Sequence, residues 1–282
     1  MLTFWRRRWF RTLPNYYLIL IINIFLVKYG IINGDFEQFG IDFFFFVQNF
    51  HEGYYDFFWE SWSLSVEEWF YIFLPILLFC SFFFLPKKQA VFIVILLLLI
   101  APLLYRISIA DIERDRFWWD TDIRKVVITR LDAIMFGVLT AYVKYYFSNF
   151  WKKNRNILAI TGVIVIWLVV YYPQNPNSFY QKTIYFTFTS LGASLLLPLA
   201  DSIQNFKYKW IEIPITFISK ISYSMYLVNM ALVAQVIEKN FILDSKTDHL
   251  VAYIAFWSCT LVISTILYKW YEKPMTNLRD RF

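Results

Sequence analysis

The sequence predicts an all-α fold, a polytopic membrane helix bundle of about eight transmembrane helices with both termini in the cytoplasm. Composition is the first indication, because 59% of the 282 residues are hydrophobic and only 17% are charged, whereas about 25% of the residues in a soluble domain are charged. The mean hydropathy of +0.48 agrees with this. Apolar runs long enough to cross about 30 Å of hydrocarbon also recur along the whole chain.

Eight of these runs predict spanning helices. They fall at 13–32, 61–85, 90–110, 126–147, 157–172, 183–200, 213–237 and 250–271. The run at 39–50 is only about twelve residues long, which favours an interfacial or re-entrant segment on the outer side over a ninth crossing. Because no linker separates the runs, we expect residues 1–282 to form a single membrane domain.

The basic residues orient the predicted bundle. With a cytoplasmic N-terminus, fifteen Lys and Arg residues fall in inner segments and seven in outer loops, as the positive-inside rule requires. The net charge of +6 follows from this distribution over five inner segments. Since no single face gathers the basic residues, we expect membrane lipids around the chain and no nucleic-acid partner.

Four ionisable side chains lie inside predicted helices. Glu67 and Glu68 lie six and seven residues from the outer end of one helix, and Arg130 and Asp132 lie four and six residues from the outer end of another. A charge at the centre of a helix costs roughly 2.5–3.5 kcal/mol in a membrane. We therefore expect Glu67 to lie close to Arg130 or Asp132 and to face a polar interior. A structural ion pair between Glu67 and Arg130 is the alternative to a functional site.

Six short motifs are spread over almost the whole chain. They are RRRWFRTLPNYY (6–17), VQN (47–49), WSLSVEEWFY (62–71), RLDAIMFG (130–137), ISYSMYLVN (221–229) and YEKP (271–274). Each is a weak signal alone, but their order makes a strong one. In this order the chain resembles the acyltransferase type 3 family, integral membrane enzymes that move acyl groups, commonly acetyl, onto sugars and other surface molecules.

The resemblance implies an acyl-CoA-dependent O-acyltransferase in a bacterial cytoplasmic membrane. The donor substrate would be acyl-CoA, commonly acetyl-CoA, and the acceptor would be a hydroxyl of a sugar, a cell-surface glycan or a lipid-linked saccharide. No permanently bound cofactor and no metal site are expected. Under this reading Glu67, Arg130 and Asp132 are the candidate catalytic residues.

The resemblance also places the donor site on the inner face. Arg7, Arg8 and Arg11 could bind the phosphates of CoA, because a guanidinium group binds phosphate in a bidentate geometry that lysine cannot copy. Their alternative role is a positive-inside anchor for the next helix. Tyr223 could supply a hydroxyl donor to the same site, and its alternative role is packing.

The start of the chain departs from the family pattern. Family members carry two further helices before the double-arginine motif, and the first of them bears an Arg and a His regarded as the catalytic base. Here His51 and His249 lie at or near outer loops, and Asn229 stands where its motif usually closes with His. We therefore expect an inactive fragment that lacks the first two helices. A transporter or flippase for a saccharide or small anionic substrate, and a protein that only binds a donor or partner, are the alternatives.

Overall fold

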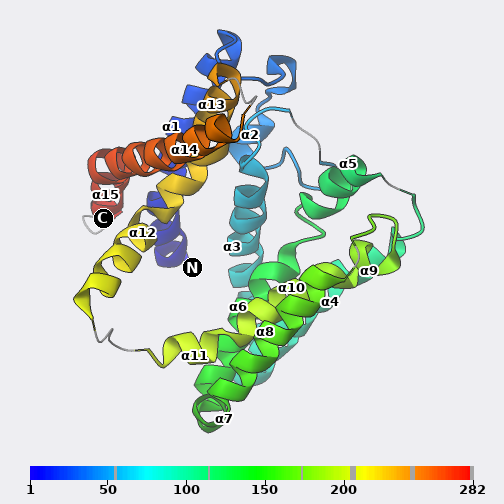
Figure 1. Ribbon diagram of the computed structural model, residues 1–282. Coiled ribbons are helices and arrows are strands. Elements are labelled where there is room, and N and C mark those ends of the chain that lie inside the picture. The colour runs from blue at the N-terminus through cyan, green and yellow to red at the C-terminus, as the bar shows by residue number, and fades with distance from the viewer. Residues whose placement is uncertain (54–55, 114, 173, 204–207, 242–244, 280–282) are drawn as a thin grey trace. The chain divides into compact units, whose positions relative to one another are not determined.

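The computed structural model describes residues 1–53, 56–113, 115–172, 174–203, 208–241 and 245–279 (Figure 1). Over these residues the chain is 79% helix with no strand, which confirms the predicted all-α class. Within the described ranges, six helical stretches are long and apolar enough to span a membrane, namely Leu2–Lys28, Ser61–Phe82, Lys87–Ser108, Ile184–Asp201, Lys209–Asn240 and Lys246–Leu278.

The predicted number of eight crossings is not settled by these six helices. The two remaining apolar runs form the shorter helices α6 (Leu131–Tyr146) and α8 (Arg155–Tyr171). At 1.5 Å per residue, each spans about 25 Å. Residues 39–50 contain only the four-residue helix α2 (Asp42–Phe45), which agrees with the prediction that this segment is not a crossing.

The chain is divided into two compact units, here called unit 1 and unit 2. Unit 1 comprises Met1–Phe45, Tyr55–Ser61 and Phe206–Phe282, and unit 2 comprises Phe46–Tyr54 and Trp62–Asn205. The expectation of a single membrane domain stays a prediction.

Unit 1 is built from the first helix of the chain and the last ones. Its elements are α1 (Leu2–Lys28), η1 (Phe36–Gln38), α2, α12 (Lys209–Val228), the π-helical stretch η3 (Asn229–Ala234), α13 (Gln235–Asn240), α14 (Lys246–Leu267), the π-helical stretch η4 (Tyr268–Glu272) and α15 (Lys273–Leu278). Helix α12 packs against α14, and α1 contacts both α12 and α15. Residues more than 200 positions apart in the sequence therefore lie side by side.

Unit 2 holds the middle of the chain. Its elements are α3 (Ser61–Phe82, apart from its first residue), α4 (Lys87–Ser108), α5 (Arg116–Trp119), the π-helical stretch η2 (Asp120–Arg124), α6, α7 (Ser148–Lys153), α8, α9 (Phe179–Lys182), α10 (Ile184–Leu195) and α11 (Leu197–Asp201). Helices α3, α4 and α6 share a hydrophobic core that includes Val66, Phe70, Val94, Leu131 and Met135. In the sequence, Val66 and Leu131 of this core are direct neighbours of predicted catalytic residues.

Helices α8 and α10 lie next to each other in unit 2 (Figure 1), and glycines allow the close approach. A Cβ atom added to Gly162 would lie 2.8 Å from the carbonyl oxygen of Gly192, and one added to Gly192 would lie 2.8 Å from Cγ1 of Ile166. Small residues at such contacts let helix backbones approach closely where lipid provides no hydrophobic driving force.

Two differences in where helices begin change the position of candidate site residues. Helix α1 begins at Leu2 and not at 13, so the arginines of the first motif belong to the helix. Helix α6 begins at Leu131 and not at 126, with Arg130 as its N-cap residue. The prediction that Arg130 and Asp132 lie one turn or more inside the helix is therefore wrong, because residues 126–130 form a turn held by side-chain hydrogen bonds of Thr129.

Candidate functional site

Asn49, from the VQN motif, brings three of the motifs together in unit 2. Its Nδ2 donates hydrogen bonds to the carbonyl oxygens of Trp62 (3.0 Å) and Lys125 (2.5 Å). Its own carbonyl oxygen accepts from the backbone N–H of Val127 at 2.9 Å. Asn49 therefore ties the beginning of α3, where the WSLSVEEWFY motif starts, to the turn that leads into α6 and the RLDAIMFG motif.

Asp132 forms an ion pair with Arg106 of α4. The Oδ1 and Oδ2 atoms of Asp132 accept hydrogen bonds from Nη1 (3.1 Å) and Nη2 (2.7 Å) of Arg106. Both side chains are completely buried, with exposed fractions of 0% and 1%. The pair is bidentate, the arrangement in which arginine binds a carboxylate most strongly.

Every N–H group of the Arg106 guanidinium is used. Besides Asp132, it donates to the carbonyl oxygens of Thr129 and Thr183 and to the hydroxyl of Thr187. Arg106 thereby joins α4, the turn before α6 and the start of α10. A buried charge whose hydrogen bonds are all satisfied fits a structural role, so the catalytic role of Asp132 stays a prediction.

Glu67 and Glu68 differ in their surroundings. Glu68 is buried, with an exposed fraction of 3%, whereas Glu67 is half-buried. The Oε1 atom of Glu67 accepts a hydrogen bond of 3.1 Å from the hydroxyl of Tyr71, one turn further along α3. Contact of Glu67 with Arg130 or Asp132 stays a prediction.

Arg130 lies against an aromatic ring. Its guanidinium carbon is 4.5 Å from the centroid of the Phe186 ring, and that of Arg106 is 5.5 Å from the same centroid. The Nε atom of Arg130 is buried and has no hydrogen-bond partner among the described residues. Arg130 is thus a cation beside Asp132 that keeps an unused donor, whereas Arg106 keeps none.

A second polar cluster joins the other three motifs in unit 1. The Oε2 atom of Glu272 accepts hydrogen bonds from Nδ2 of Asn15 (3.0 Å) and from the hydroxyl of Ser224 (2.5 Å). All three side chains are buried. Asn15 belongs to the first motif, Ser224 to ISYSMYLVN and Glu272 to YEKP, so segments up to 257 residues apart converge on one carboxylate.

The predicted donor-side residues lie beside this cluster. Arg7 and Arg11 are exposed and one turn apart on α1, whereas Arg8 is half-buried. The hydroxyl of Tyr223 donates a hydrogen bond of 2.8 Å to the carbonyl oxygen of Thr12 on α1. Tyr223 thus holds α12 against α1, which matches its alternative role in packing.

Glu60 is a further buried acid of unit 1. Its Oε1 accepts a hydrogen bond of 2.6 Å from the backbone N–H of Ala231 in η3, and its carbonyl oxygen accepts one from the hydroxyl of Tyr226 at 2.7 Å. Burial raises the pKa of the Glu60 carboxyl to about 7, although the backbone hydrogen bonds act in the opposite direction. A carboxyl with such a pKa can exchange a proton near neutral pH.

Sequence reasoning missed Arg106, Glu272 and Glu60. Arg106 lies near the end of a predicted apolar helix, so the criterion that selected Glu67 would have selected it too. Glu272 is part of a motif that was quoted, but nothing in the sequence connects it with Asn15 or Ser224. Glu60 directly precedes a predicted helix and looks like an ordinary exposed residue of a loop.

The family model for the acyltransferase domain of type 3 matches residues 1–269 of the chain. The chain belongs to the acyltransferase type 3 family. It is also similar to two proteins of Staphylococcus aureus, strains COL and MW2, each named "Putative O-acetyltransferase", at 24% identity over 226 residues and 76% of this chain. The alignment covers 35% of each relative, so the chain spans about a third of their length. No solved structure matches.

The hydrogen bonds around Asn49 in unit 2 and around Glu272 in unit 1 can be related to the family motifs. The motifs that carry the resemblance sort into two groups of three, one group in each unit. In unit 1, residues of all three motifs hydrogen-bond to one another through Glu272. In unit 2, Asn49 hydrogen-bonds to Trp62 of a second motif and to the turn that precedes the third. In this member of the family the motifs therefore hold separate segments of the chain together.

Proposed function

We propose that this acyltransferase moves an acyl group, commonly acetyl, from acyl-CoA to a hydroxyl of a sugar, a cell-surface glycan or a lipid-linked saccharide. The observation that carries the proposal is the family match over residues 1–269. The names of the S. aureus relatives support transfer to oxygen. The apolar helices support a membrane location, and we place the protein in the bacterial cytoplasmic membrane.

The reaction needs a group that accepts a proton and a group that stabilises negative charge. The acceptor oxygen attacks the thioester carbon as its proton is removed, the carbonyl oxygen becomes an oxyanion, and the C–S bond then breaks to release CoA as a thiolate that takes up a proton. Glu67 is our candidate for the proton acceptor, since it is a half-buried carboxylate next to a phenol. Arg130, with its unused Nε–H, is our candidate for the oxyanion donor.

Donor binding is assigned to the arginines of α1. CoA brings a pyrophosphate and a ribose phosphate, and guanidinium groups bind such phosphates in bidentate fashion. Arg7 and Arg11 lie four residues apart and therefore on the same face of the helix, and both are exposed. In this proposal Asp132 acts as a positioning residue, because Arg106 occupies both of its oxygens.

The proposal is tested by donor binding and transfer in membranes that contain the chain. Radiolabelled acetyl-CoA should bind with an affinity that falls as salt is added, and Arg7→Gln should weaken binding more than Lys153→Gln, an exposed basic residue of α7. Base-labile label in membrane saccharide is the result that this proposal requires, and it would contradict the expectation from the sequence that the chain is an inactive fragment. Glu67→Gln should lower that label by about 10² to 10⁴-fold, whereas Glu52→Gln should not. A chain that neither binds the donor nor labels saccharide would contradict the proposal.

A further inference from the structure

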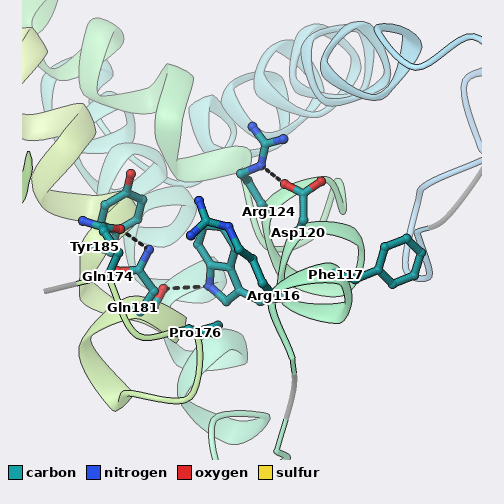
Figure 2. Close-up of a pocket in the computed structure, with 9 residues that line it drawn as sticks. Arg116, Phe117, Asp120, Arg124, Gln174, Pro176, Gln181 and Tyr185 are labelled. Carbon is teal, nitrogen blue, oxygen red and sulfur yellow. Dashed lines mark hydrogen bonds and ion pairs between the residues drawn. The ribbon is translucent and has the colours of Figure 1, made fainter. Parts of the chain in front are cut away.

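Unit 2 contains a pocket of about 630 Å³ between the segment that includes α5 and η2 and the segment that leads into α9 and α10. Figure 2 shows Arg116 between the Gln174–Gln181 pair and the Asp120–Arg124 pair, with Phe117 directed away. The volume is in the range of small-molecule sites. Both segments belong to loops that the basic residues predict to be outside.

Direct contacts join the two segments that form the pocket. The indole N–H of Trp119 donates a hydrogen bond of 3.1 Å to the carbonyl oxygen of Gln181. The buried amino group of Lys182 donates to the carbonyl oxygens of Ala110 (2.8 Å) and Ile112 (2.7 Å). The walls of the pocket are therefore held by protein contacts, as a pre-formed site requires.

Among the described residues that line it, the pocket carries one available positive charge. Asp120, the acidic residue among those lining it, is paired with Arg124 and, at 2.6 Å, with Lys125. Burial tends to raise the pKa of the Asp120 carboxyl, but its two basic partners outweigh burial and hold the pKa below the ordinary value. Arg116 is exposed, and its side chain has no hydrogen bond or ion pair within the described part of the chain. Its guanidinium is free to bind an anion.

A buried acceptor at the pocket also lacks a donor. Gln181 lines the pocket and is only 3% exposed. Its Nε2 donates a hydrogen bond of 2.8 Å to Oε1 of Gln174, while its own Oε1 has no partner among the described residues. Because this oxygen is buried, a ligand hydroxyl reaches it only when the Gln181 side chain rotates toward the pocket. The hydrogen bond gained would then offset part of the cost of a buried polar atom without a partner.

We propose that this pocket binds an anionic sugar unit, one that bears a carboxylate or a phosphate. The anionic group would pair with Arg116, and a hydroxyl would donate to Oε1 of Gln181 after that side chain rotates toward the pocket. The inference rests on the proposed function only in naming this sugar as part of the acceptor, since binding itself requires no acyl donor.

The chemistry of the lining favours a sugar over a simple anion. A hydroxyl both donates and accepts hydrogen bonds, and the pocket offers groups of both kinds. Gln181 and Asp120 supply acceptors, and Arg116 supplies donors. The half-buried Tyr185 also lines the pocket, and its phenol can act as donor or acceptor. A simple anion would use only the donors.

The test is direct binding to the purified chain in detergent, without acyl-CoA. The probes are tri-galacturonate, a sugar phosphate such as glucose 1-phosphate, the neutral maltotriose, and inorganic phosphate. We expect at least one of the two anionic sugars to bind, and maltotriose to bind about ten-fold more weakly or less. Arg116→Gln should weaken binding of the anionic sugar by about ten-fold to a hundred-fold, as expected for loss of a charge-assisted hydrogen bond. Lys153→Gln, which removes an exposed charge outside the pocket, should leave it unchanged.

Tyr185→Phe is a second variant, because it removes a single hydroxyl and keeps the ring. Weaker binding in both variants, with melting temperatures unchanged, would support the pocket. Equal binding of maltotriose and the anionic sugars, or no effect of Arg116→Gln, would overturn it. Inorganic phosphate binding as tightly as the sugars would show a simple anion site and would also overturn the proposal. Sugar binding without any transfer would contradict the proposed function and leave this inference standing.

Discussion

At the scale of single residues, the charges in unit 2 are divided by how completely they are paired. Arg106 and Asp132 are fully buried and use all the donors of the guanidinium. Arg130 and Glu67 are each only half-buried, and Arg130 retains a free Nε–H. The Arg106–Asp132 pair therefore serves the fold, whereas Arg130 and Glu67 are better placed for chemistry.

The Arg106–Asp132 pair makes a prediction about stability. Replacing Arg106 by Met removes one partner and leaves a buried carboxylate uncompensated, which should cost on the order of 3–5 kcal/mol. The measurement is thermal unfolding of the purified chain in detergent. Replacing Asp132 by Leu in the same chain should recover part of the loss, because the uncompensated charge is then gone.

Lys144 and Asp201 offer a matched control for this experiment. They form an ion pair of 2.6 Å whose side chains are 55% and 39% exposed. Breaking an exposed pair typically costs less than about 1 kcal/mol, so Lys144→Met should shift the melting temperature little. Equal shifts for Arg106→Met and Lys144→Met would contradict the structural role of the buried pair.

At the scale of helices, α8 and α10 depend on glycine for their contact. The prediction is that Gly162→Ala destabilises the chain, because the new methyl group would lie 2.8 Å from the carbonyl oxygen of Gly192 and the helices would have to separate. Gly137 in α6 is the control, since a Cβ there meets no atom within 4 Å. Gly137→Ala should be neutral or stabilising by up to about 1 kcal/mol, the difference in helix propensity. Similar melting temperatures for the two variants would refute the close contact.

At the scale of the whole chain, the distribution of basic residues predicts which loops lie on which side of the membrane. Loops 111–125 and 173–182 are both predicted to be outside, and in unit 2 they form one pocket. Two loops can meet at one face only if an even number of crossings separates them. Between them the structure places α6, the six-residue helix α7 and α8. Two crossings, by α6 and α8, would meet this condition although each of these helices is short.

Cysteine labelling tests this topology. The exposed Cys80 and Cys259 are first replaced by Ser, and single cysteines are then placed at Lys87, Lys153 or Glu113, which are all exposed. A membrane-impermeant thiol reagent added to intact cells should label position 113 and not the other two, while opened membranes should be labelled at all three. Labelling of position 87 in intact cells would reverse the predicted orientation.

The fold class and the family could be predicted from local features of the chain. Each of the eight apolar runs corresponds to a helix or a helical stretch, because burial in lipid requires a continuous run of apolar side chains and this is visible in sequence order. The motifs are likewise short and contiguous. Helix ends were predicted less well, since the start of α6 at Leu131 depends on hydrogen bonds of Thr129 to residues before it.

The partners of the buried polar groups could not be predicted in this way. Asp132 lies two residues from Arg130, yet its ion pair is with Arg106 on another helix. Glu272 accepts its hydrogen bonds from residues 48 and 257 positions away. Helical periodicity shows only that a polar side chain inside an apolar segment must find a partner. Which partner it finds depends on how the helices pack, because hydrogen bonds act only over about 3 Å and packing brings together residues that are remote in the chain.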